Sequence, residues 1–365
     1  MWSRNFFSIG KFGRGGSATG DDDATPHKTP PPPPPLLPPA PPLPEAIANA
    51  QARGQVYIFD LPADIDPARK LLERYSGIRA KNVDEHIHTI VSGLSCLCIH
   101  ELRHNPTSCK PYFLCIHSYN GPLGWNTNVS ISQRDKLWEI YPHVCVGHFR
   151  FLSLQFTSDP HYRDALRRLQ RPGSDAAFLD VGCCVGQVLR QLALDGADSR
   201  RLYGVDVEEG FVQAGYELFR DRDKLKATFV VGDLLLKSDE DCGSLKALEG
   251  KMTIVHAMSF FHLFGWDAQV RAAARIVGFL RPDDPDVVIF GRHVGTSQPG
   301  GGGGGARPVS TYLHNAETWQ KLWNEVGELT GTRWRTEVEF LDRTDINMGG
   351  LEGAVRRLRF AVFRA

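Results

Sequence analysis

The stretch that decides the fold is FLDVGCCVGQVLRQLALDGA, residues 178–197. It begins as a short, mostly apolar strand, continues through a turn bounded by Gly182 and Gly186, and leads into a helix near Gln187. A strand, a tight turn and a helix in this order bring backbone N–H groups and a helix N-terminus to the end of the strand. The stretch therefore predicts a seat for an anionic group at this turn.

Strands and helices alternate outward from this stretch, which is typical of a parallel sheet covered on both faces. Two later strands follow a helix that Asn315 caps and Gly331 ends, and an earlier helix is expected to have Asp66 as N-cap and Pro67 as its first residue. The expected strands cover 176–181, 201–207, 227–233, 252–258, 286–292, 334–341 and 356–365. We predict an α/β fold: a seven-stranded, mostly parallel, doubly wound sheet whose final strand forms an antiparallel edge, with an N-terminal helical cap.

Acidic residues end two of these strands beside the turn. Asp206 lies in YGVDV, where a carboxylate can accept both hydroxyls of a ribose. The next strand ends in Gly232-Asp233-Leu234, where the carboxylate can accept from an adenine amino group while Leu234 packs on the ring. Three successive strand ends thus predict a site for a cofactor that contains adenosine.

The spacing of the glycines separates two such cofactors. A dinucleotide fold would have glycine at 182, 184 and 187, but this chain has Cys184 and Gln187. The pattern Asp180-x-Gly182-x-x-x-Gly186 resembles motif I of class I S-adenosylmethionine-dependent methyltransferases, from which Cys184 departs because many members have glycine there. The resemblance implies S-adenosylmethionine as cofactor, with the acid near the methionine ammonium and the loop on its carboxylate. The implied cofactor residues are Asp180, Gly182, Cys183, Gly186, Gln187, Asp206, Val207, Gly232, Asp233 and Leu234.

Three segments are similar to a narrower group, the fungal methyltransferases of meroterpenoid biosynthesis of the austinol and terretonin type. They are DVGCCVGQVLRQLALDGA, GYELFRDRDKL (215–225) and SFFHLFGW (259–266), and the similarity covers roughly 66–90 and 134–365. This resemblance implies methylation of the carboxyl group of a prenylated aromatic polyketide by a homodimer. The resemblance supports the cofactor more strongly than the substrate, because the shared motifs do not determine which residues line a substrate pocket.

The acceptor decides whether the reaction needs a base. A carboxylate is already ionised at pH 7, whereas a phenol benefits from a general base, for which His262 is the candidate. Phe261, Trp266 and Arg292 are candidate substrate-binding residues. Two alternatives stay open: a phenol O-methyltransferase of the same fold, and a catalytically silent module that binds the cofactor and supports a partner.

Composition excludes other classes of function. The 42 basic residues balance the 42 acidic residues, so the basic excess of a nucleic-acid binder is missing, and no apolar run of 18 residues predicts a membrane span. Eight cysteines, two of them adjacent, do not suggest a disulfide framework, so we expect a cytoplasmic protein. Cys96 and Cys98 with scattered histidines lack the paired spacing of a zinc site, and no metal is expected.

The chain divides into three parts on this reading. Residues 1–52 are a Pro-rich leader expected to be disordered, 53–172 the helical cap, and 173–365 the methyltransferase domain, with a Gly-rich loop at 299–306. Residues 91–133 differ in amino-acid composition from the segments on either side, and they are either an insertion or a translated intron. Val91-Ser92 can be encoded by a splice-donor consensus, and removal of the segment joins HIHTI to RDKLWEI as one amphipathic helix.

Overall fold

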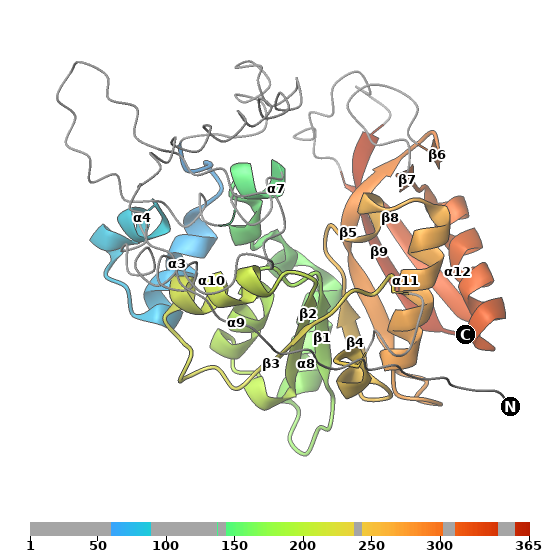
Figure 1. Ribbon diagram of the computed structural model, residues 1–365, viewed down its shortest axis with the longest axis horizontal. Coiled ribbons are helices and arrows are strands. Elements are labelled where there is room, and N and C mark those ends of the chain that lie inside the picture. Colours follow the sequence, from blue (N-terminus) through green and yellow to red (C-terminus); the bar gives the residue numbers. More distant parts are fainter. Residues whose placement is uncertain (1–59, 89–136, 138–143, 237–242, 302–310, 342–354) are drawn as a thin grey trace, which may run out of the picture. The chain divides into compact units, whose positions relative to one another are not determined.

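The computed structural model describes residues 60–88, 137, 144–236, 243–301, 311–341 and 355–365 (Figure 1). Its main sheet has seven strands in the order β3-β2-β1-β4-β5-β9-β8. The strands are β1 (Phe178–Val181), β2 (Leu202–Asp206), β3 (Thr228–Val231), β4 (Ile254–His256), β5 (Val288–Thr296), β8 (Trp334–Leu341) and β9 (Val355–Arg364). Strands β1 to β5 pair in parallel, which confirms the predicted seven-stranded, mostly parallel sheet.

The C-terminal strand lies inside the sheet, which corrects the expectation that it forms the edge. Strand β9 pairs antiparallel with β5 on one side and with β8 on the other, so β8 is the edge strand. Burial explains the order: Leu358 and Phe360 of β9 are fully covered, whereas β8 is buried only at Trp334 and alternates between exposed and half-buried residues beyond it. An alternating strand suits an edge, and a strand with an apolar centre suits the interior.

Helices cover both faces of the sheet. They are α3 (Asp66–Ser76), α4 (Ala80–His88), α7 (Val144–Gly147), α8 (Pro160–Gln170), α9 (Gln187–Leu194), α10 (Glu209–Phe219), α11 (Trp266–Phe279) and α12 (Ala316–Thr330). Short 3-10 turns join them at η1 (Arg150–Leu152), η2 (Gln155–Ser158), η3 (Ser199–Arg201), η4 (Leu245–Leu248) and η5 (Phe261–Leu263).

Each face has its own apolar core, because successive strand residues point to opposite sides. Phe178 belongs to the core under α3, α8, α9 and α10, whereas its neighbour Leu179 belongs to the core under α11 and α12. Figure 1 shows α11 and α12 next to β5, β8 and β9, with α9 and α10 beside β1 and β2. The helices before β1 therefore share a core with the sheet.

Two helix ends test the expected caps. The Asn315 side chain accepts from the Thr318 N–H in a capping box, and Gly331 ends α12 in the left-handed region, as predicted. For α3 the N-cap is Ile65, and Asp66 is the first helical residue with no capping hydrogen bond, which corrects the expected N-cap. The Asp66 carboxylate instead accepts from Arg69 Nη1 at 2.7 Å, one turn along the helix.

Several predictions fall largely outside the described residues. These include the leader at 1–52, the segment 91–133 and most of the Gly-rich loop, although Gly300–Gly301 form strand β6, paired with β7 (Tyr312–Leu313). Among the described helices, none is both long and apolar enough to cross a membrane.

Candidate active site

The turn after β1, residues 182–186, is called the glycine loop below. Gly182, Cys184 and Gly186 all have positive φ, at 67°, 49° and 64°. The N–H groups of Gly182 and Cys183 both donate to the Val205 carbonyl, which ties the loop to the end of β2. A Cβ on Gly186 would lie 2.7 Å from Arg190 Nη1, so only glycine fits this N-cap of α9. The loop is thus wound tightly over the end of β1, as its spacing predicts.

Asp206 joins the glycine loop to the ends of β2 and β3. Its Oδ2 accepts from the Cys184 N–H at 2.8 Å and its Oδ1 from the Glu208 N–H at 3.1 Å, while its main-chain carbonyl accepts from the Gly232 N–H. Burial raises the pKa of this carboxyl, and the backbone donors act in the opposite direction. Each carboxylate oxygen can accept a second hydrogen bond, so Asp206 retains capacity for a pair of hydroxyls.

At the end of β3, the side chains of Asp233 and Leu234 are less available to a ligand than the sequence predicts. Asp233 Oδ1 accepts from the Leu235 N–H at 2.8 Å, which stabilises the local turn and leaves the other oxygen for a ligand. Leu234 is 6% exposed and packs in the core on the α11 side. Two apolar side chains near these strand ends are exposed to solvent: Val207, directly after Asp206, is 58% exposed, and Val231, the last residue of β3, is 39% exposed.

These groups fit the three parts of S-adenosylmethionine. The buried Gln187 Oε1, in the first turn of α9, has no hydrogen-bond partner among the described residues, and an amide oxygen can accept from an ammonium group. Asp206 offers acceptors for ribose hydroxyls, and the exposed Val207 offers an apolar contact for adenine. The amino-acid tail would lie over the glycine loop and the start of α9, where the helix dipole favours a carboxylate.

The Asp180 carboxylate is paired within the protein. It is 3% exposed and pairs with His256 of β4, with 2.8 Å between Oδ1 and Nδ1. The His256 ring packs against Phe156, Phe178 and Phe290, on the face that α8 and α9 cover. This pair was not predicted, although Asp180 and His256 occupy facing positions on neighbouring strands that are otherwise apolar.

The predicted site residues that follow β4 differ in how deeply they are buried. Phe261 is fully buried against Trp319 and Phe360, so the structure places this predicted substrate residue behind the surface. His262 is half-buried, with its ring 6.5 Å from that of His293. Trp266 is half-buried at the start of α11 and donates from Nε1 to Glu325 at 2.7 Å.

Two further histidines lie behind His262 and were not predicted. His293 is almost fully buried, with neither ring nitrogen paired among the described residues, and burial holds its pKa well below the usual value. His314 contacts Gln269 through Nε2 and Thr318 through Nδ1, and burial lowers its pKa to about 4. Both rings are therefore neutral at pH 7, which suits a wall for an uncharged part of a substrate.

Arg292 of β5 is paired within the protein. Its Nε lies 3.2 Å from Asp159 Oδ2, and its Nη2 lies 3.4 Å from Ser158 Oγ. Asp159 is also the N-cap of α8, where it accepts from the His161 N–H. The guanidinium thus connects β5 to the helices before β1, and a substrate carboxylate would have to share it with Asp159.

The low pKa of His314 makes the stability of the fold depend on pH. An unfolded histidine takes up a proton below about pH 6.5, whereas the folded His314 stays neutral to about pH 4, so its contribution is complete above pH 6.5 and lost as pH falls. We expect the free energy of unfolding to drop by about 2 kcal/mol between pH 6.5 and 5 on this account alone. Urea titrations of the wild type and His314→Gln measure it: the variant should show a shallower pH dependence, and equal dependence would contradict the assignment.

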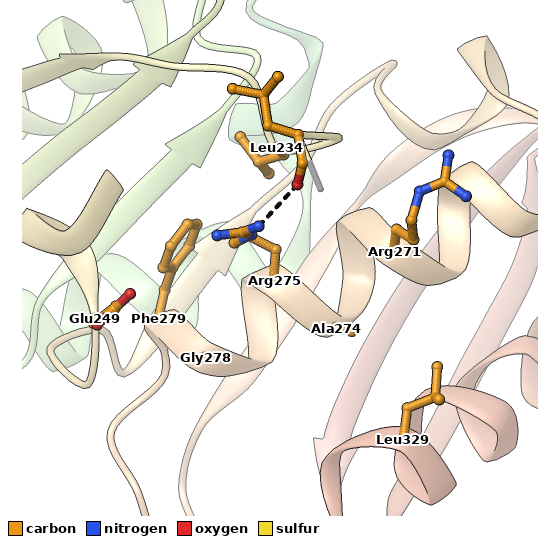
Figure 2. A pocket seen from close by; sticks show the side chains of 9 residues that line it. Leu234, Glu249, Arg271, Ala274, Arg275, Gly278, Phe279 and Leu329 are labelled. Carbon is orange, nitrogen blue, oxygen red and sulfur yellow. Dashed lines mark hydrogen bonds between the residues drawn. The ribbon is translucent and has the colours of Figure 1, made fainter. Parts of the chain in front are cut away.

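A cavity of about 620 Å³ has no residue of the glycine loop in its lining. It is formed between α11 and the segment after β3, and Figure 2 shows Arg275 reaching from α11 toward that segment, where Nη2 donates to the Leu236 carbonyl at 3.0 Å. Among the cofactor candidates only Leu234 lines it.

Comparison with known proteins agrees with this geometry. A family model described as a methyltransferase domain matches residues 178–283, which include the glycine loop, Asp206 and Asp233. The chain belongs to the class I S-adenosylmethionine-dependent methyltransferases, and it is an enzyme that uses S-adenosylmethionine.

The similar relatives are fungal. The chain is 47% identical to O-methyltransferase phiE of Fungal sp. (strain ATCC 74256) over 209 residues, which are 57% of this chain and 68% of that protein. It is 32% identical to O-methyltransferase atr3 of Stereocaulon alpinum over 337 residues, covering 89% and 80%. It is 33% identical to methyltransferase trt5 of Aspergillus terreus (strain NIH 2624 / FGSC A1156), covering 56% and 71%. The resemblance to fungal methyltransferases of this kind is thereby confirmed.

Proposed function

We propose that the enzyme methylates an oxygen of a small secondary metabolite, and that this oxygen belongs to the carboxyl group of a prenylated aromatic polyketide. The observation that supports the proposal is the approach of Phe260, one of the half-buried aromatic residues after β4, to the glycine loop: a Cβ on Gly182 would lie 3.2 Å from its Cδ2 atom. Two relatives are named O-methyltransferases, which supports oxygen as the acceptor atom.

Among the histidines of β4 and the described segments after it, the structure leaves His262 as the base candidate that a phenol would need, whereas a carboxylate would need none. His256 is bound to Asp180, while His293 and His314 are buried with lowered pKa values, so none of the three is placed to take a proton from a substrate. His262 is the remaining histidine after β4. A carboxylate brings its own lone pair to the methyl group: the new C–O bond forms as the C–S bond breaks, and S-adenosylhomocysteine leaves without any proton transfer. The protein then contributes mainly position and removal of water.

The aromatic edge suits the apolar part of such a substrate. Phe260, Phe264, Trp266 and Tyr312 are all half-buried and pack edge to face, with 5.1 Å between the rings of Phe260 and Phe264 and 5.0 Å between those of Trp266 and Tyr312. Rings that are covered on one side and open on the other can stack on an aromatic acceptor or contact a prenyl chain. A nucleic-acid substrate is not proposed, because the chain carries no net charge.

The test is a pair of acceptors that differ only in the carboxyl group. The full chain is incubated with S-adenosylmethionine and either a prenylated phenolic acid or its decarboxylated phenol, and the product is treated with alkali. A methyl ester is cleaved by alkali, whereas a methyl ether survives. Ester formed only from the acid supports the proposal, and ether formed from both acceptors favours the phenol alternative.

The same pair of acceptors gives an expected result for His262→Ala. Because a carboxylate needs no base, we expect the variant to retain turnover of the acid within about threefold, whereas a catalytic base for a phenol is worth about 10²–10⁴-fold. Leu263→Ala, at the exposed neighbouring position, controls for disturbance of the η5 turn. A hundredfold loss that is confined to His262→Ala would contradict carboxyl chemistry. The measurement is initial rate at saturating S-adenosylmethionine.

A further inference from the structure

A fully buried polar network connects the glycine loop to helix α3. The Arg190 guanidinium, on α9, donates from Nη1 to the main-chain carbonyls of Val185 at 2.6 Å and Gly186 at 3.3 Å. Its Nε and Nη2 donate to the two carboxylate oxygens of Asp221 at 2.8 and 2.9 Å. The Tyr75 hydroxyl of α3 donates to the same Asp221 Oδ2 at 2.9 Å. Five hydrogen bonds thus link α3 to the loop through two charged side chains.

The burial of this network argues for a positional role. Both Arg190 and Asp221 have fully buried side chains, and the guanidinium lies 4.6 Å from the centre of the Phe219 ring. A buried ion pair stabilises a fold little more than apolar residues of the same size would, because desolvation offsets the attraction. What apolar residues could not supply is a rigid, planar donor group aimed at two neighbouring carbonyls.

The two carbonyls fix the direction of the chain where α9 begins. In a trans peptide the carbonyl and the following N–H point in opposite directions. A hydrogen bond that holds the Gly186 carbonyl toward Arg190 therefore also fixes the N–H of Gln187, the first residue of α9. Gly186 has no Cβ that would obstruct this contact, because a Cβ there would collide with Arg190 Nη1.

We propose that Arg190 is a positioning residue for the amino-acid tail of S-adenosylmethionine and that Tyr75, through Asp221, makes cofactor affinity depend on the docking of α3. The inference rests on the assignment of the glycine loop to the cofactor. Asp221 follows α10 and receives Arg190 Nε and the Tyr75 hydroxyl on one oxygen, so loss of the hydroxyl lets the carboxylate rotate and the guanidinium follow it. Burial and the neighbouring Asp221 charge raise the pKa of Tyr75, which keeps its hydroxyl a donor.

Two tyrosines provide a matched test. Tyr75→Phe removes the hydroxyl that reaches Asp221, and Tyr162→Phe removes the hydroxyl of another buried tyrosine, which donates to Asp195 Oδ2 at 2.8 Å. Asp195 is the C-cap of α9, so both tyrosines contact groups around the same helix, but only Tyr75 connects to the glycine loop. Isothermal titration of the full chain with S-adenosylhomocysteine should give a Kd about tenfold weaker for Tyr75→Phe and unchanged for Tyr162→Phe. Thermal unfolding should show that both variants lose stability.

The outcomes separate the proposal from a general loss of stability. Equal Kd values for Tyr75→Phe and wild type, or equal weakening by the two variants, would overturn it. Arg190→Lys is the second variant: it keeps the positive charge beside Asp221 but not the planar group, and its Kd should also rise. Unchanged binding by Arg190→Lys overturns the positioning role. Wild type that binds no S-adenosylhomocysteine would instead remove the cofactor assignment on which the inference rests.

Discussion

The Asp206→Ala variant should bind S-adenosylhomocysteine about 10²–10³-fold more weakly than wild type. The carboxylate is the proposed acceptor for two ribose hydroxyls, and a hydrogen bond to a charged group contributes roughly 1.5–3 kcal/mol. The substitution also removes the acceptor for the Cys184 N–H, so the glycine loop loses one of its hydrogen bonds to the end of β2, while those from Gly182 and Cys183 to the Val205 carbonyl remain. Isothermal titration measures the change in Kd directly.

A matched control for Asp206→Ala lies at the other end of the same strand. Asp198 also accepts a backbone N–H, from Arg200, in the turn that leads into β2. Asp198→Ala should lose that hydrogen bond and leave cofactor binding unchanged. Asp206→Asn should fall between wild type and Asp206→Ala, because an amide retains one acceptor oxygen. Binding by Asp206→Ala within threefold of wild type would show that the ribose is held elsewhere.

Trp319→Ala should destabilise the fold by about 3–5 kcal/mol, the usual range for truncation of a large buried aromatic residue. Trp319 is fully buried on α12 and packs against Phe261, His293 and Phe360, so it supports the segment that carries His262. Leu329→Ala on the same helix is the control, because Leu329 is 64% exposed and its truncation should change stability by about 0.5 kcal/mol or less. Urea unfolding compares the two. Equal losses would mean that α12 does not anchor the core.

The main strands and helices could be predicted from the sequence alone. All seven strands of the main sheet lie at the predicted positions, because buried parallel strands read as short apolar runs between helices. Helix α12 was predicted from its caps, since Asn315 and Gly331 act through local backbone geometry. The start of α3 was wrong by one residue, because Asp66 pairs with Arg69 instead of capping.

Pairings between distant segments were beyond the sequence. The position of β9 between β5 and β8 depends on which strands meet, and a single chain gives no signal for that choice. The Asp180–His256 and Arg190–Asp221 pairs each join residues from different elements, so neither partner alone predicts the other. An arginine in the apolar helix QVLRQLAL and a histidine in a core strand were the available signals, because a buried charge or imidazole requires a partner.

The place of β9 in the sheet has a consequence for folding kinetics. Helices α9, α10 and α11 join β1 to β2, β2 to β3 and β4 to β5, whereas β9 pairs with β5 across a long separation in sequence, from Val288 to Phe363 at one end of the register. Contacts between distant segments slow folding, because the chain loses the entropy of closing the loop between them before the stabilising contacts form. We expect an early species in which the β1 to β4 half is formed while the surface of β5 that β9 will cover still faces solvent. Such an exposed strand edge can pair with another chain and cause aggregation. The yield of refolded protein should therefore fall as protein concentration rises, at concentrations where the refolding rate is still unchanged.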